Sequence, residues 1–167
     1  MSGDLTDLGL NVQLRDIPAI RVARLRYGGA PAEIGAAFTR VTDFAVRHGV
    51  GPCGPVLGVF PRLAVGVDSI EAMVCAPLTR LPASDEADIE TLRLPRSRAA
   101  CLIYAGPMTS EFRQCHLDLF AWMDSRGVPR DGTMHQHAYL AGTGPDSEWT
   151  VEIRVPVLGG HAPVTPI

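Results

Sequence analysis

A glutamate lies in the middle of a segment whose composition alternates like that of a β-strand. In WTVEIRVPV, residues 149–157, an apolar side chain occurs at every second position and Glu152 falls between two of them. A period of two is typical of a strand with one buried face, so Glu152 belongs to the opposite face. If that face lines a groove, the carboxylate can hold a cation or act as a general base towards a water molecule. If it faces solvent, Glu152 has no chemical role, and the alternation alone favours this simpler alternative.

Aromatic side chains and one methionine are the other candidates for a ligand site. Tyr104 and Tyr139 come first, because a tyrosine offers its ring face to a cation and its hydroxyl to a polar group of a ligand. The alternative for each is core packing, since aromatic residues make up only 6% of the chain. The further candidates are Tyr27, Met73, Phe112 and Trp149.

Two histidines in the segment Met134-His-Gln-His137 raise the question of a metal site. Histidines two residues apart on a strand project to one face, but a zinc site needs further ligands. His116 falls on a predicted helix, and no other group of histidine, cysteine or aspartate residues completes the set. We therefore interpret His135 and His137 as surface or groove-edge residues, and expect no metal and no cofactor.

The composition is that of an ordinary globular domain. The 167 residues suffice for one domain with a substantial core, and 46% of them are hydrophobic. The net charge is −3 and no basic cluster occurs, so we expect no direct nucleic-acid binding. No run approaches the roughly 18 apolar residues of a membrane span, and the first ten residues do not resemble a signal peptide. We expect a cytoplasmic protein without a membrane partner. The chain has no lysine, which excludes Schiff-base chemistry.

The elements that must position these residues are predicted by an internal repeat. Two segments each carry Leu-Arg, a proline, a β-like run and a closing tyrosine and glycine, and each is followed by a helical pattern that ends at a glycine. The offset between the halves grows slowly, as small loop insertions in a duplicated unit would make it grow. Matching landmarks are Tyr27 and Tyr104 at 77 residues, Gly49 and Gly127 at 78, and Pro77 and Pro156 at 79.

Each half predicts two strands, a helix and two further strands, which indicates an α+β fold. We expect two βαββ modules related by a pseudo-twofold axis, with antiparallel sheets around a central ligand groove and the helices on the outer side. One domain would span residues 11–158, with module one at 11–80 and module two at 89–158. Residues 1–10 and 159–167 would be flexible ends. The expected strands include residues 11–16, 20–27, 56–60, 68–76, 136–141 and 149–157, and the expected helices are residues 32–48 and a segment that begins at Glu111.

The repeat gives Glu152 a partner position in the other module. At the corresponding place in module one stands Met73. One wall of the groove would then be acidic and the other a deformable thioether, a combination that suits flat ligands of varied shape.

The sequence resembles the GyrI-like family, the effector-binding domain of bacterial transcription activators. The resemblance extends from about residue 11 to residue 158, and the closing strand is its most specific part. The features that carry it are Leu14-Arg-Asp-Ile-Pro18, Tyr27-Gly-Gly29, Ile103-Tyr-Ala-Gly-Pro107, Leu119-Phe-Ala-Trp122, Ala138-Tyr-Leu140 and Thr150-Val-Glu-Ile-Arg-Val-Pro156.

This resemblance implies a groove between two βαββ modules that binds hydrophobic, aromatic and often cationic molecules, with Glu152 as the buried acid facing the ligand. A free-standing member of this kind would sense or sequester such compounds. Members often carry Asp-Pro where this chain has residues 141–145, Ala-Gly-Thr-Gly-Pro. Because only residues 1–10 precede the first module in the sequence, we expect no DNA-binding segment there.

The resemblance also leaves two alternatives. One is a hydrolase that opens strained cyclopropane-type rings, with Glu152 as general base and Tyr104 as the nearby aromatic residue. The other is a protein-interaction module that inhibits a topoisomerase. The sequence leaves open whether two chains pair as a homodimer.

Overall fold

The computed structural model describes residues 10–63, 68–142 and 148–159. The ends predicted to be flexible lie almost wholly outside these described residues. None of the helices in the described ranges is long and apolar enough to cross a membrane.

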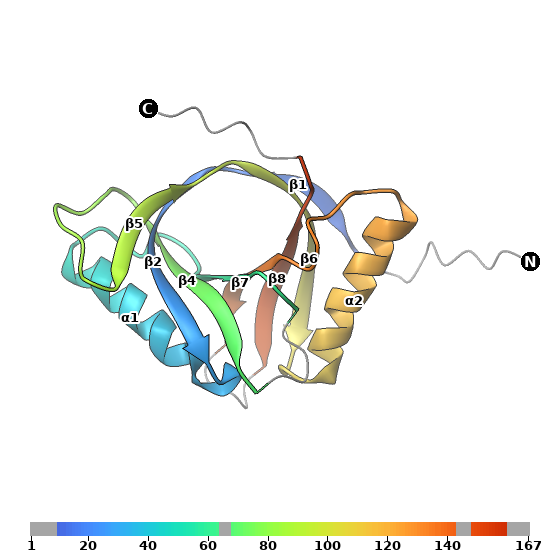
Figure 1. The fold of residues 1–167 in the computed structure, drawn as a ribbon, viewed down its shortest axis with the longest axis horizontal. Coiled ribbons are helices and arrows are strands. Elements are labelled where there is room, and N and C mark those ends of the chain that lie inside the picture. Colours follow the sequence, from blue (N-terminus) through green and yellow to red (C-terminus); the bar gives the residue numbers. More distant parts are fainter. Residues whose placement is uncertain (1–9, 64–67, 143–147, 160–167) are drawn as a thin grey trace, which may run out of the picture.

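The chain folds as two similar halves, each with two strands, a helix and two strands (Figure 1). The first half comprises β1 (Gln13–Ile17), β2 (Ile20–Gly29), the short 3-10 helix η1 (Pro31–Glu33), α1 (Ile34–Arg47), β3 (Leu57–Phe60) and β4 (Ile70–Leu78). The second half comprises β5 (Ile89–Leu94), β6 (Ser97–Gly106), α2 (Ser110–Ser125), β7 (His135–Ala141) and β8 (Trp149–Pro156). These elements confirm the predicted α+β fold.

All eight strands form one antiparallel sheet in the order β1-β6-β8-β7-β3-β4-β2-β5. The first strand of each half pairs with the second strand of the other half, so the halves exchange strands. Ile17 lies opposite Ser97, and Ile20 lies opposite Leu94. The segment β1–β2 therefore runs beside β5–β6 in one continuous register, and this ribbon ties the two ends of the sheet together. The sheet curls as a result, as Figure 1 shows.

Both helices lie on the outer, convex face of the curled sheet (Figure 1). In α1 the buried side chains of Ala37, Val41 and Phe44 are spaced three and four residues apart, which presents one apolar stripe to β2 and β4. In α2 the equivalent stripe contains Leu119 and Met123 and packs against β6 and β8. Each module thus has its own core between its helix and the outer face of the sheet. The helices do not cover the opposite, inner face.

The strand registers confirm the predicted equivalence of Met73 and Glu152. Tyr27 of β2 lies opposite Ala72 of β4, and Tyr104 of β6 lies opposite Val151 of β8. Since the tyrosines correspond in the repeat, the residues that follow Ala72 and Val151 also correspond. These are Met73 and Glu152.

Candidate functional site

Glu152 lies on the inner face of the sheet, away from the helices, as the alternation predicted. Its Cα partners are Ile103 of β6 and Ala138 of β7, and the residue is only 5% exposed. The Oε1 atom accepts hydrogen bonds from Arg15 Nη2 at 3.0 Å and from Arg154 Nε at 2.5 Å. One carboxylate between two guanidinium groups leaves a net positive charge on the trio. Glu152 is therefore a partner in an internal ion pair rather than a free anion for a cationic ligand.

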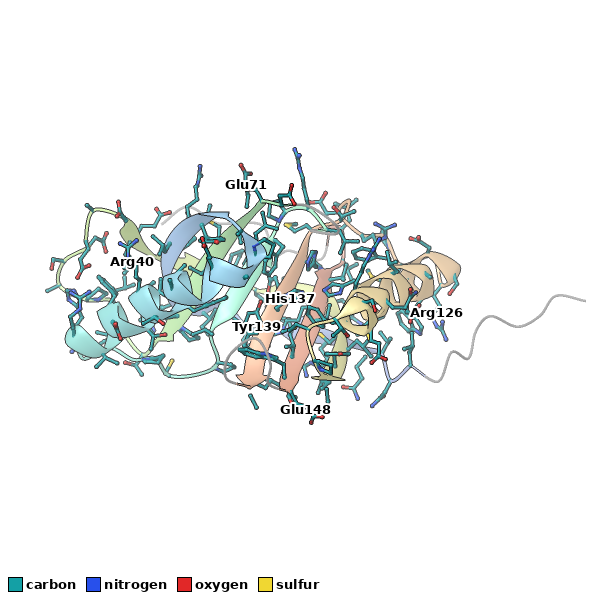
Figure 2. The ribbon with its side chains drawn as sticks, turned by 90° about the horizontal axis from the view of Figure 1, so that it is seen from below. Arg40, Glu71, Arg126, His137, Tyr139 and Glu148 are labelled. Atoms are coloured by element: carbon teal, nitrogen blue, oxygen red, sulfur yellow. The ribbon has the colours of Figure 1, made fainter. Side chains whose placement is uncertain are left out.

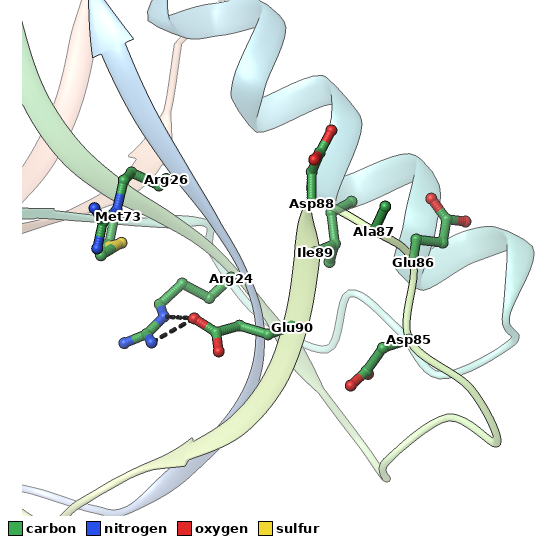
Figure 3. Close-up of a pocket in the computed structure, with 9 residues that line it drawn as sticks. All are labelled: Arg24, Arg26, Met73, Asp85, Glu86, Ala87, Asp88, Ile89 and Glu90. Carbon is green, nitrogen blue, oxygen red and sulfur yellow. Dashed lines mark hydrogen bonds and ion pairs between the residues drawn. The ribbon is translucent and has the colours of Figure 1, made fainter.

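Met73 also lies on the inner face, where it borders a pocket of about 380 Å³ (Figure 3). Arg24 and Arg26 of β2 line the same pocket, and Arg24 Nε donates to Glu90 Oε1 at 2.9 Å. The remaining lining comes from residues 85–90, and none of the lining residues is aromatic. The lining of this pocket is therefore of mixed charge and offers no ring on which a flat ligand could stack, while Met73 also packs against the buried apolar side chains of Leu57, Cys75 and Ala138.

Tyr104 lies on the opposite face from Glu152. Ile103 and not Tyr104 stands opposite the glutamate, and Tyr104 packs into the core beneath α2. Its hydroxyl donates to the Pro107 carbonyl, as the Tyr27 hydroxyl donates to the Ala30 carbonyl in the other module. Burial raises the pKa of Tyr104, and the carboxylates of Glu111 and Glu148 add to this effect. The expectation that Tyr104 and Tyr27 line one groove with Glu152 is wrong.

The remaining predicted aromatic residues also lie on the outer face. Tyr139 of β7 contacts the ring of Phe38 from α1, with 5.0 Å between centroids, and the ring of Trp149 from β8, at 5.9 Å. Phe112 of α2 contacts His137 at 5.1 Å and Tyr104 at 5.0 Å. The expectation that Tyr139, Phe112 and Trp149 share a face with Glu152 is therefore wrong as well. Figure 2, seen from the helix side, shows His137 and Tyr139 between the two helices.

These rings form one continuous group over the junction of the modules, which we call the interhelical ring cluster. Phe38, Phe112, Tyr139 and Trp149 are half-buried, whereas Phe60 beneath them is only 5% exposed. Phe60 belongs to β3, which pairs with β7 at the junction. The half-buried rings belong to four elements drawn from both modules: α1, α2, β7 and β8.

Three histidines complete the floor of the cluster. His116 of α2 and His135 and His137 of β7 are 3%, 2% and 6% exposed. One ring nitrogen of each lies within 4.8 Å of those of the other two, and Nε2 of His116 is 2.7 Å from Nε2 of His137. The interpretation of His135 and His137 as surface or groove-edge residues is wrong, because both are buried beneath α2 and the ring of Phe60.

Burial also fixes the protonation of these histidines. It lowers the pKa of His116 to about 4, with a further contribution from the nearby His135. It lowers the pKa of His135 and of His137 in the same direction. All three imidazoles are neutral at pH 7, and each therefore retains one nitrogen lone pair.

A family model described as a GyrI-like small molecule binding domain matches residues 10–158. No sequence among the curated proteins matches the chain.

Solved structures share the fold at low sequence identity. The C-terminal domain of EcmrR has a TM-score of 0.68 and 18% identity, and the match covers 89% of this chain and 97% of that one. EcmrR in its complex with DNA has a TM-score of 0.70 and 16% identity, with coverage of 87% of this chain and 56% of that one, so this chain spans little more than half of EcmrR.

Two further structures differ in what they are described to do. A hydrolase encoded by lin2189 from Listeria innocua has a TM-score of 0.62 and 13% identity, with coverage of 87% and 91%. SAV2435 bound to tetraphenylphosphonium has a TM-score of 0.56 and 13% identity, with coverage of 89% and 94%. At such identities these likenesses concern the fold alone.

Proposed function

Because the chain belongs to the GyrI-like family of small-molecule-binding domains, we propose that it binds a hydrophobic, aromatic and cationic compound at the interhelical ring cluster. In this role the protein senses or sequesters such compounds. The proposal keeps the ligand class that the sequence suggests and moves the site from the inner face of the sheet to the outer face.

The observation that carries the proposal is the convergence of half-buried rings from both modules. Phe38 approaches from α1, Phe112 from α2 and Tyr139 from the strand between them. Half-buried aromatic side chains can cover a flat ligand and remove its surface from water, at about 25 cal/mol per Å² of apolar area. The pocket beside Met73 on the inner face lacks this property, since none of its lining residues is aromatic.

Charge around the cluster favours a cation. Burial raises the pKa of Tyr27 and of Tyr104, and nearby carboxylates add to the effect: Glu33 at Tyr27, and Glu111 and Glu148 at Tyr104, whose ring contacts Phe112 of the cluster. Aromatic faces themselves attract a cation, by about 0.5–2 kcal/mol. The carboxylate of Glu152 contributes nothing here, because it lies on the other face of the sheet and is paired with two arginines.

Two tetraphenyl ions of the same shape and opposite charge provide the test. The protein is titrated by calorimetry with tetraphenylphosphonium and with tetraphenylborate. We expect tetraphenylphosphonium to bind at least about tenfold more tightly, a difference that the ring faces and the carboxylates near Tyr27 and Tyr104 would produce together. Equal affinity for the two ions, or absence of binding to both, would contradict the proposal.

Two truncations locate the site on one face of the sheet. Phe112→Ala removes a half-buried ring from the cluster, and we expect it to weaken binding about tenfold. Ile103→Ala is the matched control, because Ile103 is 58% exposed and stands beside Glu152 on the inner face. Weaker binding in Ile103→Ala with unchanged binding in Phe112→Ala would return the ligand to the inner face.

The alternatives are less well supported. In a ring-opening hydrolase that uses Glu152 and Tyr104 together, both side chains would have to reach one substrate, and they lie on opposite faces of the sheet. Inhibition of a topoisomerase, pairing of two chains and a cytoplasmic location stay predictions from the sequence.

A further inference from the structure

We propose that His116, His135 and His137 bind one divalent metal ion of the zinc class on the outer face of the sheet, between α1 and α2. This site does not depend on the small molecule proposed above, since it uses only side chains of the chain itself. Its elements are the helix of module two and the strand that joins module two to module one.

The hydrogen bonds that two of the histidines make at Nδ1 place the lone pair on Nε2, the nitrogen that would bind a metal. His116 Nδ1 is 2.8 Å from the Phe112 carbonyl oxygen, and His135 Nδ1 is 2.8 Å from the Thr133 carbonyl oxygen. A carbonyl only accepts, so Nδ1 carries the proton in both rings and Nε2 carries the lone pair. Metal-binding histidines in proteins usually donate their other ring N–H to a carbonyl or carboxylate in this way.

The third histidine can adopt the same form. In the structure, His137 Nε2–H donates to His116 Nε2 at 2.7 Å, while His137 Nδ1 accepts from the Tyr139 hydroxyl at 3.2 Å. If the proton moves to Nδ1, the Tyr139 hydroxyl becomes the acceptor and Nε2 is free to bind. The His137 ring thus changes from one tautomer to the other, and in both tautomers its Nδ1 is hydrogen-bonded to the Tyr139 hydroxyl, which can donate or accept.

The spacing of the nitrogens requires only small movements. Three nitrogens at zinc-binding distances of about 2.0–2.1 Å in a tetrahedral site lie about 3.3 Å apart. The pair His116 and His137 must open from 2.7 Å, and the other two nitrogen pairs, each within 4.8 Å, differ from this spacing by at most about 1.5 Å. Rings of Phe60 and Phe112 contact the imidazoles and keep them in place.

Ligand type and burial select the metal. Imidazole nitrogens suit zinc, copper, nickel and iron, and exclude calcium and magnesium, which prefer oxygen. The three side chains are at most 6% exposed, so the site is shielded from bulk solvent. Three histidines leave a fourth position in a tetrahedral site, where water or a donor atom of a ligand binds.

The competing explanation is a self-contained cluster of hydrogen-bonded neutral histidines. Metal titration distinguishes the two. Protein freed of metal with a chelator is titrated with Zn²⁺ alone by calorimetry and with Co²⁺ alone by visible absorption. We expect one ion per chain, and intense Co²⁺ ligand-field bands of the kind that a tetrahedral site gives.

Variants assign the site to these residues. We expect His116→Gln, His135→Gln and His137→Gln each to lower the Zn²⁺ affinity by at least about tenfold. His48→Gln is the matched control, since His48 lies at the end of α1 and contacts Glu86 instead of the cluster. Cys53→Ser controls for the exposed thiol of Cys53. Unchanged affinity in the three cluster variants, or an equal loss in His48→Gln, would overturn the proposal.

A measurement on the unmodified protein covers the case in which a variant does not fold. Long-range ¹H–¹⁵N spectra of the histidine rings identify which nitrogen carries the proton and which binds metal. Addition of Zn²⁺ is expected to shift the Nε2 resonances of His116, His135 and His137 and to leave that of His48 in place. If these three resonances do not move, the site does not exist.

Discussion

Glu152 of β8 forms its ion pair with Arg15 of β1, a strand that belongs to the other module. The Oε1 atom of Glu152 is 3.0 Å from Arg15 Nη2, and Arg154 of the same strand adds a second guanidinium at 2.5 Å. The pair therefore fastens an exchanged strand to the module that receives it. This structural role accounts for the burial of a carboxylate on the inner face, since both arginines bond to it.

We predict that Glu152→Gln destabilises the fold by about 2 kcal/mol, because Arg154, whose side chain is only 16% exposed, keeps its charge and loses its partner. Urea unfolding followed by circular dichroism measures the change. Glu90→Gln is the control: its side chain is 62% exposed and pairs with Arg24, so we expect a loss of less than about 0.5 kcal/mol. Equal losses in the two variants would show that the Glu152 pair adds nothing beyond a surface contact.

We predict that neither module folds alone. A fragment of residues 11–80 keeps β1 but lacks β6, on which β1 pairs, and a fragment of residues 89–158 lacks β2, on which β5 pairs. Each fragment thus exposes a strand edge and half of a shared sheet. Amide spectra of the separate fragments are expected to show little dispersion, and mixing the two should restore it. A well-dispersed spectrum from either fragment would contradict the interdependence.

The repeat made much of the fold predictable, because strand alternation and equal landmark spacing depend on local sequence. The equivalence of Met73 and Glu152 followed from that spacing alone. The face of the sheet on which Tyr104 lies could not be predicted from the repeat spacing, because it depends on the register between β6 and β8. That register places Ile103 opposite Glu152, and a shift of one residue would have turned Tyr104 to the inner face.

The histidine cluster shows a second limit. The spacing of His135 and His137 placed them on one face of a strand, and His116 falls on the stripe of α2 that includes Leu119 and Met123. That stripe was a signal that His116 faces the sheet. The packing of α2 against the strand of His137 brings together residues 21 positions apart, and tertiary contact of this kind cannot be read from periodicity.

Gly58 of β3 makes room for the floor of the ring cluster. A Cβ atom at this position would lie 2.7 Å from the Phe60 ring, which stacks on His135. We predict that Gly58→Ala displaces the ring, costs about 1–3 kcal/mol and weakens metal binding. Gly35→Ala in α1 is the control, since nothing lies within 4 Å of its added Cβ. That change should stabilise the helix by about 0.5–1 kcal/mol. A Gly58→Ala variant with a higher free energy of unfolding than the unaltered protein would contradict the prediction.

The buried histidines make stability depend on pH. Above about pH 6.5 they are neutral in both the folded and the unfolded chain, and they add no pH dependence. Below it the unfolded chain takes up protons that the fold excludes, so the free energy of unfolding falls as the pH drops. For His116, whose folded pKa is about 4, the loss is complete only below that pH and amounts to about 3 kcal/mol. Urea unfolding at a series of pH values gives the free energy of unfolding at each pH. This free energy should fall less steeply with decreasing pH in His116→Gln than in the unaltered protein, and an identical pH dependence would contradict the prediction.

The Tyr139 hydroxyl supports His137 through its contact with Nδ1 at 3.2 Å. We predict that Tyr139→Phe costs about 1 kcal/mol, because it removes a partner from a buried ring nitrogen. It should also weaken Zn²⁺ binding about tenfold, because the second tautomer of His137 loses its acceptor. Tyr27→Phe is the matched control: it removes a hydroxyl bonded to the Ala30 carbonyl, and we expect a similar cost in stability without a change in Zn²⁺ affinity. Calorimetry gives the affinities, and the ¹⁵N resonance of His137 Nδ1 reports the lost contact directly. Equal Zn²⁺ affinity in the two variants, with an unmoved Nδ1 resonance, would show that the hydroxyl does not position the ring.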